Sequence, residues 1–213
     1  MELKTLVVGV FQVNCYLYWD PQTLDGVIID PGEEAETIIE QVDKAGFKPK
    51  AILLTHGHGD HIAAVGEIKE HFDLPLYLGD GDQTLMANPS ENVSALVGFP
   101  IVAPEADYIL TDEQDLNIGS IHFKVLATPG HTRGGVCLLD EKANLIFTGD
   151  TLFWGSIGRT DFPGGSYGQL IDSIKRKLLK LPDNIVCYPG HGPETTIGSE
   201  RVNNPFINDG GLV

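Results

Sequence analysis

Histidine and aspartate residues gather in four short segments of this 213-residue chain, and their side chains are of the kinds that bind metal ions. Seven residues form the set: His56, His58, Asp60, His61, His131, Asp150 and His191. Five of the seven histidines belong to it, whereas His71 and His122 lie elsewhere and are interpreted as structural. Imidazole nitrogens and carboxylate oxygens suit zinc, iron and manganese. Because no cysteine accompanies them, a closed structural zinc site is disfavoured and a reactive metal centre is predicted.

Seven side chains are enough for two metal ions. We assign them as two triplets, with His56, His58 and His131 around one ion and Asp60, His61 and His191 around the other. Asp150 has two carboxylate oxygens and can bridge the ions, with a hydroxide as the second bridge. Two metals about 3.5–4 Å apart would activate that hydroxide and stabilise a developing oxyanion.

Each of these segments follows a short apolar run that is typical of a β-strand. The four runs are residues 51–54, 125–127, 145–147 and 186–188. Two of the following turns contain the same Pro-Gly-His triplet, which ends at His131 and at His191. Ligands usually bind at the carboxyl ends of strands. We therefore expect the strands to share an open edge at which all seven side chains converge.

The rest of the chain alternates between predicted strands and helices. Further strands are predicted at residues 13–19, 26–29, 76–78, 121–127, 136–140, 145–148 and 185–188. Helices are predicted at 33–45, ended by Gly46, at 62–72, and from Ser166 to before Pro182, where Gln169 completes a capping box. Residues 79–104 form either a lid over the site or a packed helical excursion, and we favour packing. The whole, residues 1–213, is predicted to be one domain with two similar halves, residues 1–105 and 106–207.

The composition restricts the partners and the compartment. A formal net charge of −16 argues against nucleic acid and against an anionic membrane surface. The three cysteines lie in apolar runs and are interpreted as small buried side chains rather than a disulfide framework. No export signal or membrane span is recognised, so a cytoplasmic protein is expected. The sequence does not indicate an oligomeric state.

The pattern THGHGDH at residues 55–61, followed by His131, Asp150 and His191, resembles the metallo-β-lactamase superfamily over essentially the whole chain. The runs GDTLF at 149–153 and GRTDFPGG at 158–165 resemble the glyoxalase II (hydroxyacylglutathione hydrolase) branch, and most closely its short bacterial members. The resemblance implies an α+β fold, a four-layer αββα sandwich. It also implies two divalent metal ions per chain, with zinc first and iron or manganese as alternatives.

The implied activity is hydrolysis of a small-molecule thioester of the S-(2-hydroxyacyl)glutathione type, such as lactoylglutathione. A metal-bridging hydroxide would attack the thioester carbonyl, and Asp60 would be catalytic by orienting that hydroxide as well as binding metal. The leaving thiol has a pKa of about 8.5, so it departs without a strong general acid. In the family the aspartate at the Asp30 turn supports the metal-binding groups; a plain turn is the competing interpretation.

Substrate binding is less well defined by the sequence. Arg159 occupies the position of a basic residue that contacts glutathione in the family, but a salt bridge that stabilises the turn is an equal alternative; Tyr167 is a second candidate. Full-length glyoxalase II enzymes have a C-terminal helical extension that supplies basic residues to glutathione. This chain ends soon after His191 with a glycine-rich tail, which puts tight glutathione binding in doubt.

Three alternative functions follow from the same motifs. A persulfide dioxygenase with a single iron resembles this chain in the GRTDF run. Another hydrolase of the same fold could be a lactonase, a β-lactamase or a nuclease, although the acidic charge disfavours the nuclease and the missing export signal disfavours the β-lactamase. A non-catalytic metal-binding protein is disfavoured by the intact set of metal-binding residues.

Overall fold

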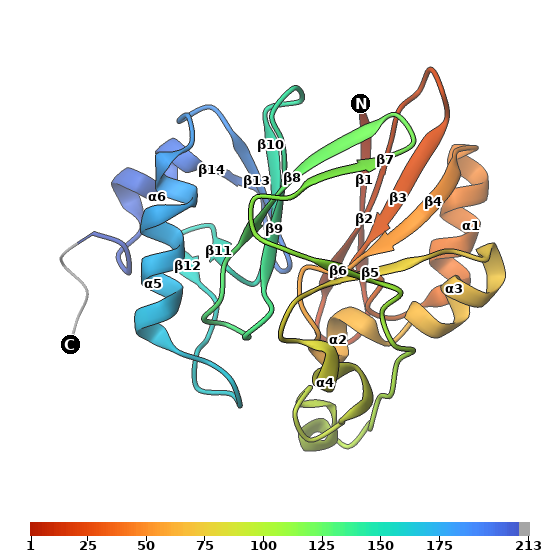
Figure 1. The fold of residues 1–213 in the computed structure, drawn as a ribbon, viewed down its shortest axis with the longest axis horizontal. Coiled ribbons are helices and arrows are strands. Elements are labelled where there is room, and N and C mark those ends of the chain that lie inside the picture. The colour runs from red at the N-terminus through yellow and green to blue at the C-terminus, as the bar shows by residue number, and fades with distance from the viewer. Residues whose placement is uncertain (209–213) are drawn as a thin grey trace.

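Two six-stranded sheets pack face to face in the computed structural model, which describes residues 1–208 (Figure 1). The predicted glycine-rich tail lies outside these residues. The first sheet has the order β1-β2-β3-β4-β5-β6 and consists of β1 (Glu2–Val8), β2 (Val13–Trp19), β3 (Asp25–Ile29), β4 (Lys48–Leu53), β5 (Leu76–Gly79) and β6 (Tyr108–Leu110). Strands β3 to β6 pair in parallel, so their carboxyl ends share one edge of the sheet.

The second sheet has the order β14-β13-β10-β9-β8-β7. Its strands are β7 (Asp115–Ile118), β8 (Ile121–Ala127), β9 (Val136–Asp140), β10 (Leu145–Gly149), β13 (Val186–Pro189) and β14 (Thr195–Thr196). A small hairpin of β11 (Leu152–Phe153) and β12 (Ser156–Ile157) follows β10. Each large sheet is therefore built from one continuous part of the chain.

Helices cover the outer face of each sheet. Those of the first half are α1 (Ala35–Ala45), α2 (Gly59–Ile62), α3 (Val65–Phe72), α4 (Gln83–Ala87) and the 3₁₀ turn η1 (Ser94–Val97). Those of the second half are α5 (Tyr167–Arg176), the 3₁₀ turn η2 (Leu178–Lys180) and α6 (Ile197–Asn203). In Figure 1, α1 and α3 flank one sheet and α5 and α6 the other, which gives the predicted four-layer αββα sandwich.

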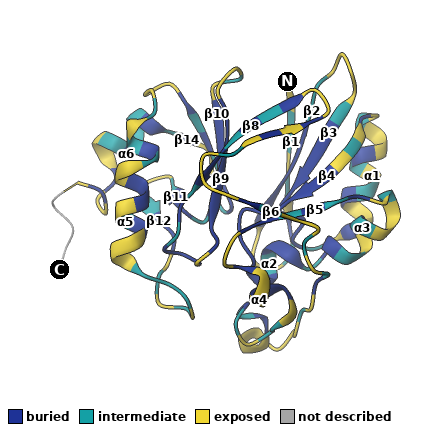
Figure 2. Ribbon diagram, viewed as in Figure 1, coloured by how far each residue is buried: buried dark blue, intermediate teal, exposed yellow. Residues whose placement is uncertain are grey.

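Alternating side chains explain why these strands are apolar on both faces. Val27 and Ile29 of β3 belong to the core between the sheets, whereas Ile28 belongs to the core beneath α1 and α3. In β10, Phe147 faces the other sheet and Ile146 faces α5. Successive strand residues point to opposite faces, so a strand covered on both sides is continuously apolar. Figure 2 shows central strands such as β9 and β10 buried and the outer faces of α1, α3 and α5 exposed.

Several predicted elements have the bounds expected. Residues 13–19, 121–127 and 136–140 are strands over the predicted ranges, and Ser166 caps α5 by accepting a hydrogen bond from the Gln169 amide. Gly46 ends α1 in the left-handed conformation. Cys15, Cys137 and Cys187 are buried free thiols, as predicted.

Two helix predictions need correction. The helix predicted over 62–72 begins at Val65 as α3, and Ile62 is instead the last residue of α2. The two helices are separate because the Ala64 amide donates to the carbonyl oxygens of Pro31 and Gly32, 3.1 Å away in each case, and does not continue α2. The helix predicted from residue 33 begins at Ala35, because Glu34 has a φ of 59° and cannot continue a right-handed helix.

Candidate metal centre

The turns after four strands bring the predicted metal-binding side chains together between the two sheets. The segment after β4, which runs into α2, supplies four of the residues from the first half, and the turns after β8, β10 and β13 supply the others from the second. Their order is His56, His58, Asp60 and His61 from the first sheet, then His131, Asp150 and His191 from the second. The site therefore depends on both halves of the chain.

Three imidazoles form the first cluster. One ring nitrogen of each of His56, His58 and His131 lies within 4.8 Å of the other two, and all three side chains are buried. The Nδ1 atom of His58 is 2.9 Å from Nε2 of His131. Two nitrogens bound to one tetrahedral zinc ion lie about 3.3 Å apart, given Zn–N bonds of about 2.0–2.1 Å. The cluster has the dimensions of a three-histidine metal site.

The second cluster consists of Asp60, His61 and His191. Nε2 of His191 lies 3.3 Å from Nε2 of His61 and 3.4 Å from an Asp60 carboxylate oxygen. Asp150 lies between the clusters, with its oxygens 3.5 Å from Nε2 of His61, 3.5 Å from Nε2 of His131 and 3.6 Å from Nε2 of His191. Asp150 thus faces residues of both triplets, the position that a bridging carboxylate requires.

Four of the imidazoles use Nδ1 for a contact outside the clusters. The contacts are His56 with Thr55 Oγ1 at 3.1 Å, His61 with Asp30 Oδ2 at 3.1 Å, His131 with the Arg159 carbonyl at 2.7 Å and His191 with the Phe11 carbonyl at 3.1 Å. A hydrogen bond that holds Nδ1–H leaves the Nε2 lone pair free for a metal. These contacts orient four rings towards the centre.

Asp30 supports this arrangement directly. Its carboxylate accepts hydrogen bonds from the Thr55 amide at 2.8 Å and the Thr55 hydroxyl at 2.6 Å, and it contacts His61. Asp30 itself has a φ of 49°, a conformation that costs a non-glycine residue about 1–3 kcal/mol and persists where the surroundings enforce it. Of the two interpretations of the Asp30 turn, the geometry favours support of the metal-binding residues.

The pKa shifts of two histidines fit metal binding, and that of a third marks an excess of negative charge. Burial lowers the pKa of His56 well below its usual value and the pKa of His58 to about 3, with neighbouring imidazoles adding to the effect, so both rings are neutral as metal ligands must be. Burial alone would lower the pKa of His61, but Asp60, Asp150 and Asp30 raise it to about 10. Three carboxylates around one buried ring concentrate negative charge that a cation would balance.

Unpartnered atoms provide a separate test of the fit. Among the described residues, the buried side-chain nitrogen and oxygen atoms without a hydrogen-bond partner are His56 Nε2, His58 Nε2 and Asp150 Oδ1. All three belong to predicted metal-binding residues, but His58 presents Nδ1 rather than Nε2 to His131, so the free atoms that test the fit are His56 Nε2 and Asp150 Oδ1. An unpaired buried polar group costs about 1–3 kcal/mol. Together with the donor set, these atoms show that the residues fit two divalent ions.

A cavity of about 740 Å³ opens onto the metal-binding residues. Its walls include His58, Asp60, His131, Asp150 and His191 from the clusters. This volume is in the usual range for a small-molecule site, about 300–1,000 Å³.

The two predicted substrate-binding residues differ in their relation to the cavity. Arg159 lines it, but its guanidinium forms two 2.8 Å hydrogen bonds with the Asp161 carboxylate and stacks on the Phe162 ring at 3.8 Å. Both interpretations of Arg159 therefore have structural support. Tyr167 is the first residue of α5, is 52% exposed and is not among the residues that line the cavity. A substrate contact of Tyr167 stays a prediction.

Two buried polar residues near the site were not predicted from the sequence. Asp82 accepts hydrogen bonds from the Gly57 amide at 3.0 Å, the Thr132 hydroxyl at 2.7 Å and the Gly134 amide at 2.6 Å. It joins the turn that carries His56 and His58 to the turn that carries His131.

Asn14 likewise holds the turn that carries His191. Its side-chain amide donates to the carbonyl oxygens of Pro189 at 2.9 Å and Gly192 at 2.8 Å. The available sequence signal was a polar residue inside the apolar run of β2.

Comparisons with known proteins agree with this geometry. The family described as the metallo-beta-lactamase superfamily matches residues 8–191. A probable metallo-hydrolase, YqgX, of Bacillus subtilis is 42% identical over 210 residues, which are 98% of this chain and 98% of that protein. The hydroxyacylglutathione hydrolase GloC of Haemophilus influenzae is 38% identical over 214 residues, 98% of this chain and 99% of that protein.

Solved structures give the same result. The BLEG-1 B3 metallo-beta-lactamase superposes with a TM-score of 0.94 at 41% identity, and the match covers 97% of this chain and 100% of that chain. TTHA1623, solved in a di-iron-bound form, has a TM-score of 0.86 at 39% identity, with 95% of this chain and 99% of that chain covered. ETHE1 from Myxococcus xanthus has a TM-score of 0.79 at 30% identity, with 96% and 84% covered.

Proposed function

This chain is a metallo-hydrolase of the metallo-β-lactamase superfamily, and we propose that its substrate is a thioester of the S-(2-hydroxyacyl)glutathione type. One observation carries the proposal: the paired clusters open onto a cavity of small-molecule size, so a carbonyl group can reach Asp60 and Asp150. The hydroxyacylglutathione hydrolase GloC, of which this chain covers 99%, supports the thioester as substrate class. Because that relative has a comparable length, a long C-terminal extension is not part of every protein with this name.

The residues divide the work of hydrolysis. When bound, the two ions supply an activated water and a Lewis acid for the carbonyl oxygen. The triplet of His56, His58 and His131 and the triplet of Asp60, His61 and His191 would hold them, with Asp150 shared. Asp60 lies on the cavity wall with its carboxylate 3.4 Å from His191, where it can accept a hydrogen bond from the attacking water and orient it.

The leaving group favours a thioester over an amide. A thiol of pKa about 8.5 departs as the thiolate without protonation, whereas an amine needs a proton donor. Apart from the metal-binding residues, the charged side chains on the cavity wall are Glu33 and Arg159, and Arg159 cannot act as an acid at neutral pH. The wall is therefore better suited to thiolate departure.

The test combines metal content with four activity assays on one preparation. We expect two ions per chain and hydrolysis of lactoylglutathione with kcat/KM above about 10⁴ M⁻¹s⁻¹, the lower end of the usual enzyme range. Oxygen uptake with glutathione persulfide, together with one iron per chain and no thioester hydrolysis, would contradict the proposal in favour of the dioxygenase. Hydrolysis of a β-lactam or a lactone without thioester hydrolysis would contradict it equally, since the BLEG-1 structure is called a metallo-beta-lactamase.

A further inference from the structure

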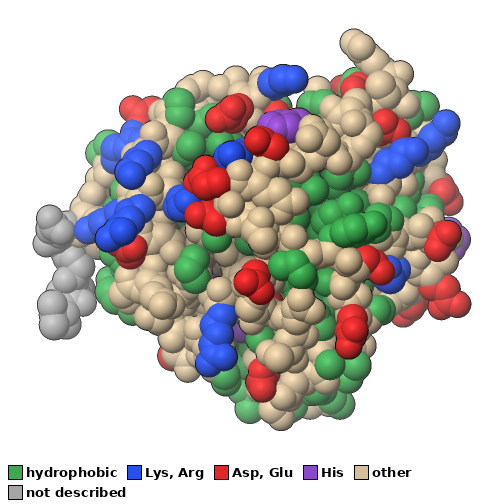
Figure 3. Space-filling view, viewed as in Figure 1, with side chains coloured by type: hydrophobic (Ala, Val, Ile, Leu, Met, Phe, Trp, Pro, Cys, Tyr) green, Lys and Arg blue, Asp and Glu red, His purple; other side chains and the backbone are tan. Residues whose placement is uncertain are grey.

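Apolar side chains dominate the cavity away from the metal-binding residues. They come from the turn after β1, from the segment around η1 and from the region after β10: Val10, Phe11, Val97, Leu96, Phe99 and Phe153. Val10, Leu96 and Phe99 are 75%, 72% and 70% exposed. Large exposed apolar side chains that gather at a cavity indicate a binding surface, whereas single scattered ones are common on any protein surface. Figure 3 shows hydrophobic side chains at the end of the molecule where α4 projects.

The segment around η1 is fixed to the metal-binding turn. The buried Asn92 side chain donates to the carbonyl oxygens of Leu85 at 2.9 Å and Ile101 at 3.0 Å. The Gly59 amide, beside Asp60, donates to the Asn92 carbonyl at 2.8 Å. These hydrogen bonds support the prediction that residues 79–104 form a packed excursion, although part of the segment also lines the cavity. Leu96 and Phe99 are thereby held at a set place relative to the reacting groups.

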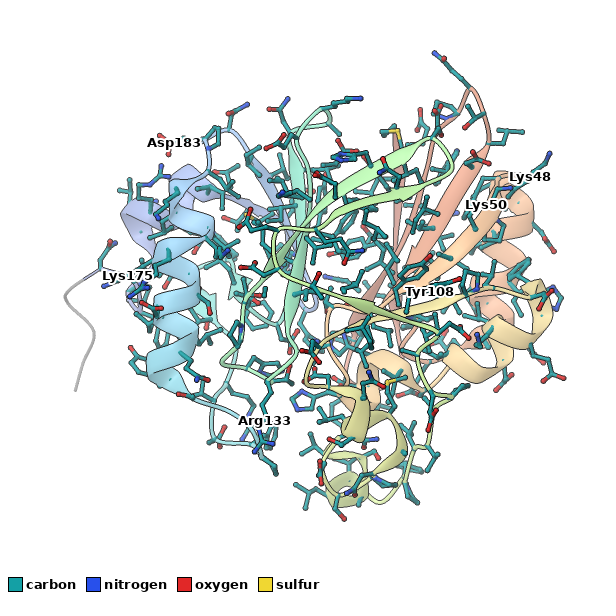
Figure 4. The ribbon with its side chains drawn as sticks, viewed as in Figure 1. Lys48, Lys50, Tyr108, Arg133, Lys175 and Asp183 are labelled. Atoms are coloured by element: carbon teal, nitrogen blue, oxygen red, sulfur yellow. The ribbon has the colours of Figure 1, made fainter. Side chains whose placement is uncertain are left out.

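The cavity offers little attraction for an anion outside the metal centre. Among the described residues that line the cavity, Arg159 is the single lysine or arginine. Its guanidinium already pairs with the Asp161 carboxylate. Glu33 adds a negative charge to the wall. Figure 4 shows Lys48, Lys50 and Lys175 on the outer parts of the molecule. Binding energy for the organic part of the substrate must come mainly from apolar contact.

We propose that the preferred substrate carries a large apolar acyl group, which binds against Val10, Phe11, Leu96, Val97 and Phe99 while its carbonyl faces the metal centre. This inference rests on the proposed function. Glutathione is polar and anionic, so the acyl group is the part of such a thioester that can be apolar. A lactoyl group has three carbons and would contact little of this wall, whereas a 2-hydroxyacyl chain of six to eight carbons or a mandeloyl ring would cover it.

The first experiment measures kcat/KM for glutathione thioesters of lactoyl, 2-hydroxybutanoyl, 2-hydroxyhexanoyl, 2-hydroxyoctanoyl and mandeloyl groups with the metal-loaded enzyme. Full burial of one methylene corresponds to about 4-fold in binding, so we expect a rise of about 2- to 3-fold per methylene against this partly open wall. Hydrolysis of all the thioesters with equal kcat/KM would overturn the acyl preference and leave the proposed function standing. Hydrolysis of none would overturn the proposed function.

A double variant identifies the wall. Leu96→Ser with Phe99→Ser should reduce the ratio of hydroxyhexanoyl to lactoyl kcat/KM by at least about 5-fold. The matched control is Val102→Ser, because Val102 is 66% exposed on the same segment but is not among the residues that line the cavity. An unchanged ratio in the double variant would place the acyl group elsewhere and contradict the proposal.

A binding assay gives a second readout that does not depend on turnover. The fluorescence of the uncharged probe N-phenyl-1-naphthylamine should show binding to the wild-type protein with and without metal, a Kd raised at least about 5-fold in the double variant and an unchanged Kd in Val102→Ser. Equal binding to all three proteins would contradict the proposal. Sedimentation tests a further possibility, that a second copy of the chain covers these residues. A dimer of the wild type that the double variant does not form, together with an unchanged acyl preference, would contradict the proposal.

Discussion

Asp150 lies where the two clusters meet, within 3.6 Å of His61, His131 and His191. The Asp150→Asn variant keeps the size of the side chain but removes its charge and one of its two acceptor oxygens. We expect it to lose at least one of the two metal ions and most of the thioester hydrolysis, about 100-fold or more, because a neutral amide is a weak metal ligand. Metal analysis and kinetics on the same sample measure both quantities.

The exposed Asp172 on α5 offers the control for that substitution. Asp172→Asn removes a surface ion pair with Arg176 and should leave metal content and kcat/KM unchanged. Two ions and full activity in Asp150→Asn would show that Asp150 does not bridge.

Asp82 tests whether a residue outside the metal-binding set controls metal affinity. In Asp82→Asn, the new NH₂ group would meet donors, since Gly57, Thr132 and Gly134 all donate to this carboxylate. The turns that carry the three-histidine cluster would separate, and we expect metal affinity to fall by about 10-fold or more. Competition for zinc with a chelator measures the affinity, and circular dichroism checks the fold.

The nearby Asp80 is exposed and gives a matched variant, Asp80→Asn. If both variants bound zinc as tightly as the wild type, Asp82 would have no positioning role.

At this scale, the sequence was informative where a side chain's type and its place at a strand end coincided, as for His131 after its Pro-Gly turn. It was not informative for Asp82, whose partners are 25, 50 and 52 residues away and are mostly backbone groups. A contact between a carboxylate and distant amides has no periodicity or spacing that a sequence displays. Arg159 was ambiguous for another reason: its pairing with Asp161 and its place on the cavity wall coexist.

Among the elements, the junction of β8 and α5 shows why His131 follows a glycine. Gly130 has a φ of 137°, and a Cβ atom there would lie 2.2 Å from the Leu170 amide nitrogen of α5. Gly130→Ala would force α5 away from the sheet, and we expect a loss of about 3 kcal/mol or more in the free energy of unfolding. Denaturant unfolding measures the loss, and zinc competition should show weaker binding at His131.

Gly168, on the exposed side of α5, provides the opposite case. An added methyl group there meets nothing within 4 Å, so Gly168→Ala should stabilise the protein by about 0.5–1 kcal/mol through helix propensity. Equal stability of Gly130→Ala and the wild type would mean that this packing does not constrain the turn.

The element predictions succeeded where burial was one-sided or complete, as in β8 and β9, because the pattern of apolar residues then follows the strand. No strand was predicted for β1, β6 or β7. β1 is an edge strand whose side chains are mostly exposed or half-buried, and β6 has three residues. The division between α2 and α3 depends on hydrogen bonds from Ala64 to the Asp30 turn, which local propensity does not encode.

At the scale of the whole molecule, the negative charge of the chain extends into the metal centre. The chain has a formal charge of −16, and three of its carboxylates gather around the buried His61 ring: Asp30, which is buried, and Asp60 and Asp150, which line the cavity. Within residues 1–208, no helix is both long enough and apolar enough to span a membrane. The cytoplasmic location, the absence of a nucleic-acid partner and the single-domain organisation stay predictions.

Because the metal-binding residues come from both sheets, metal should join the halves energetically as well as geometrically. One ion that binds a single site of the folded chain alone stabilises it by about 4 kcal/mol when its free concentration is 1,000 times the Kd, so one site sets the minimum for two. For a chain of this length, about 2–4 °C per kcal/mol converts this to a rise in Tm of about 10 °C on loading metal-free protein with zinc. Calorimetry measures the rise, with magnesium as the control ion, since magnesium prefers oxygen ligands and should add little. One cooperative transition in both states would support a single folding unit. An unchanged Tm, with two zinc ions bound, would mean that the metal clusters do not link the two sheets. The link between the sheets would then depend on their shared apolar core and on contacts such as those of Asn14 with the Pro189 and Gly192 carbonyls.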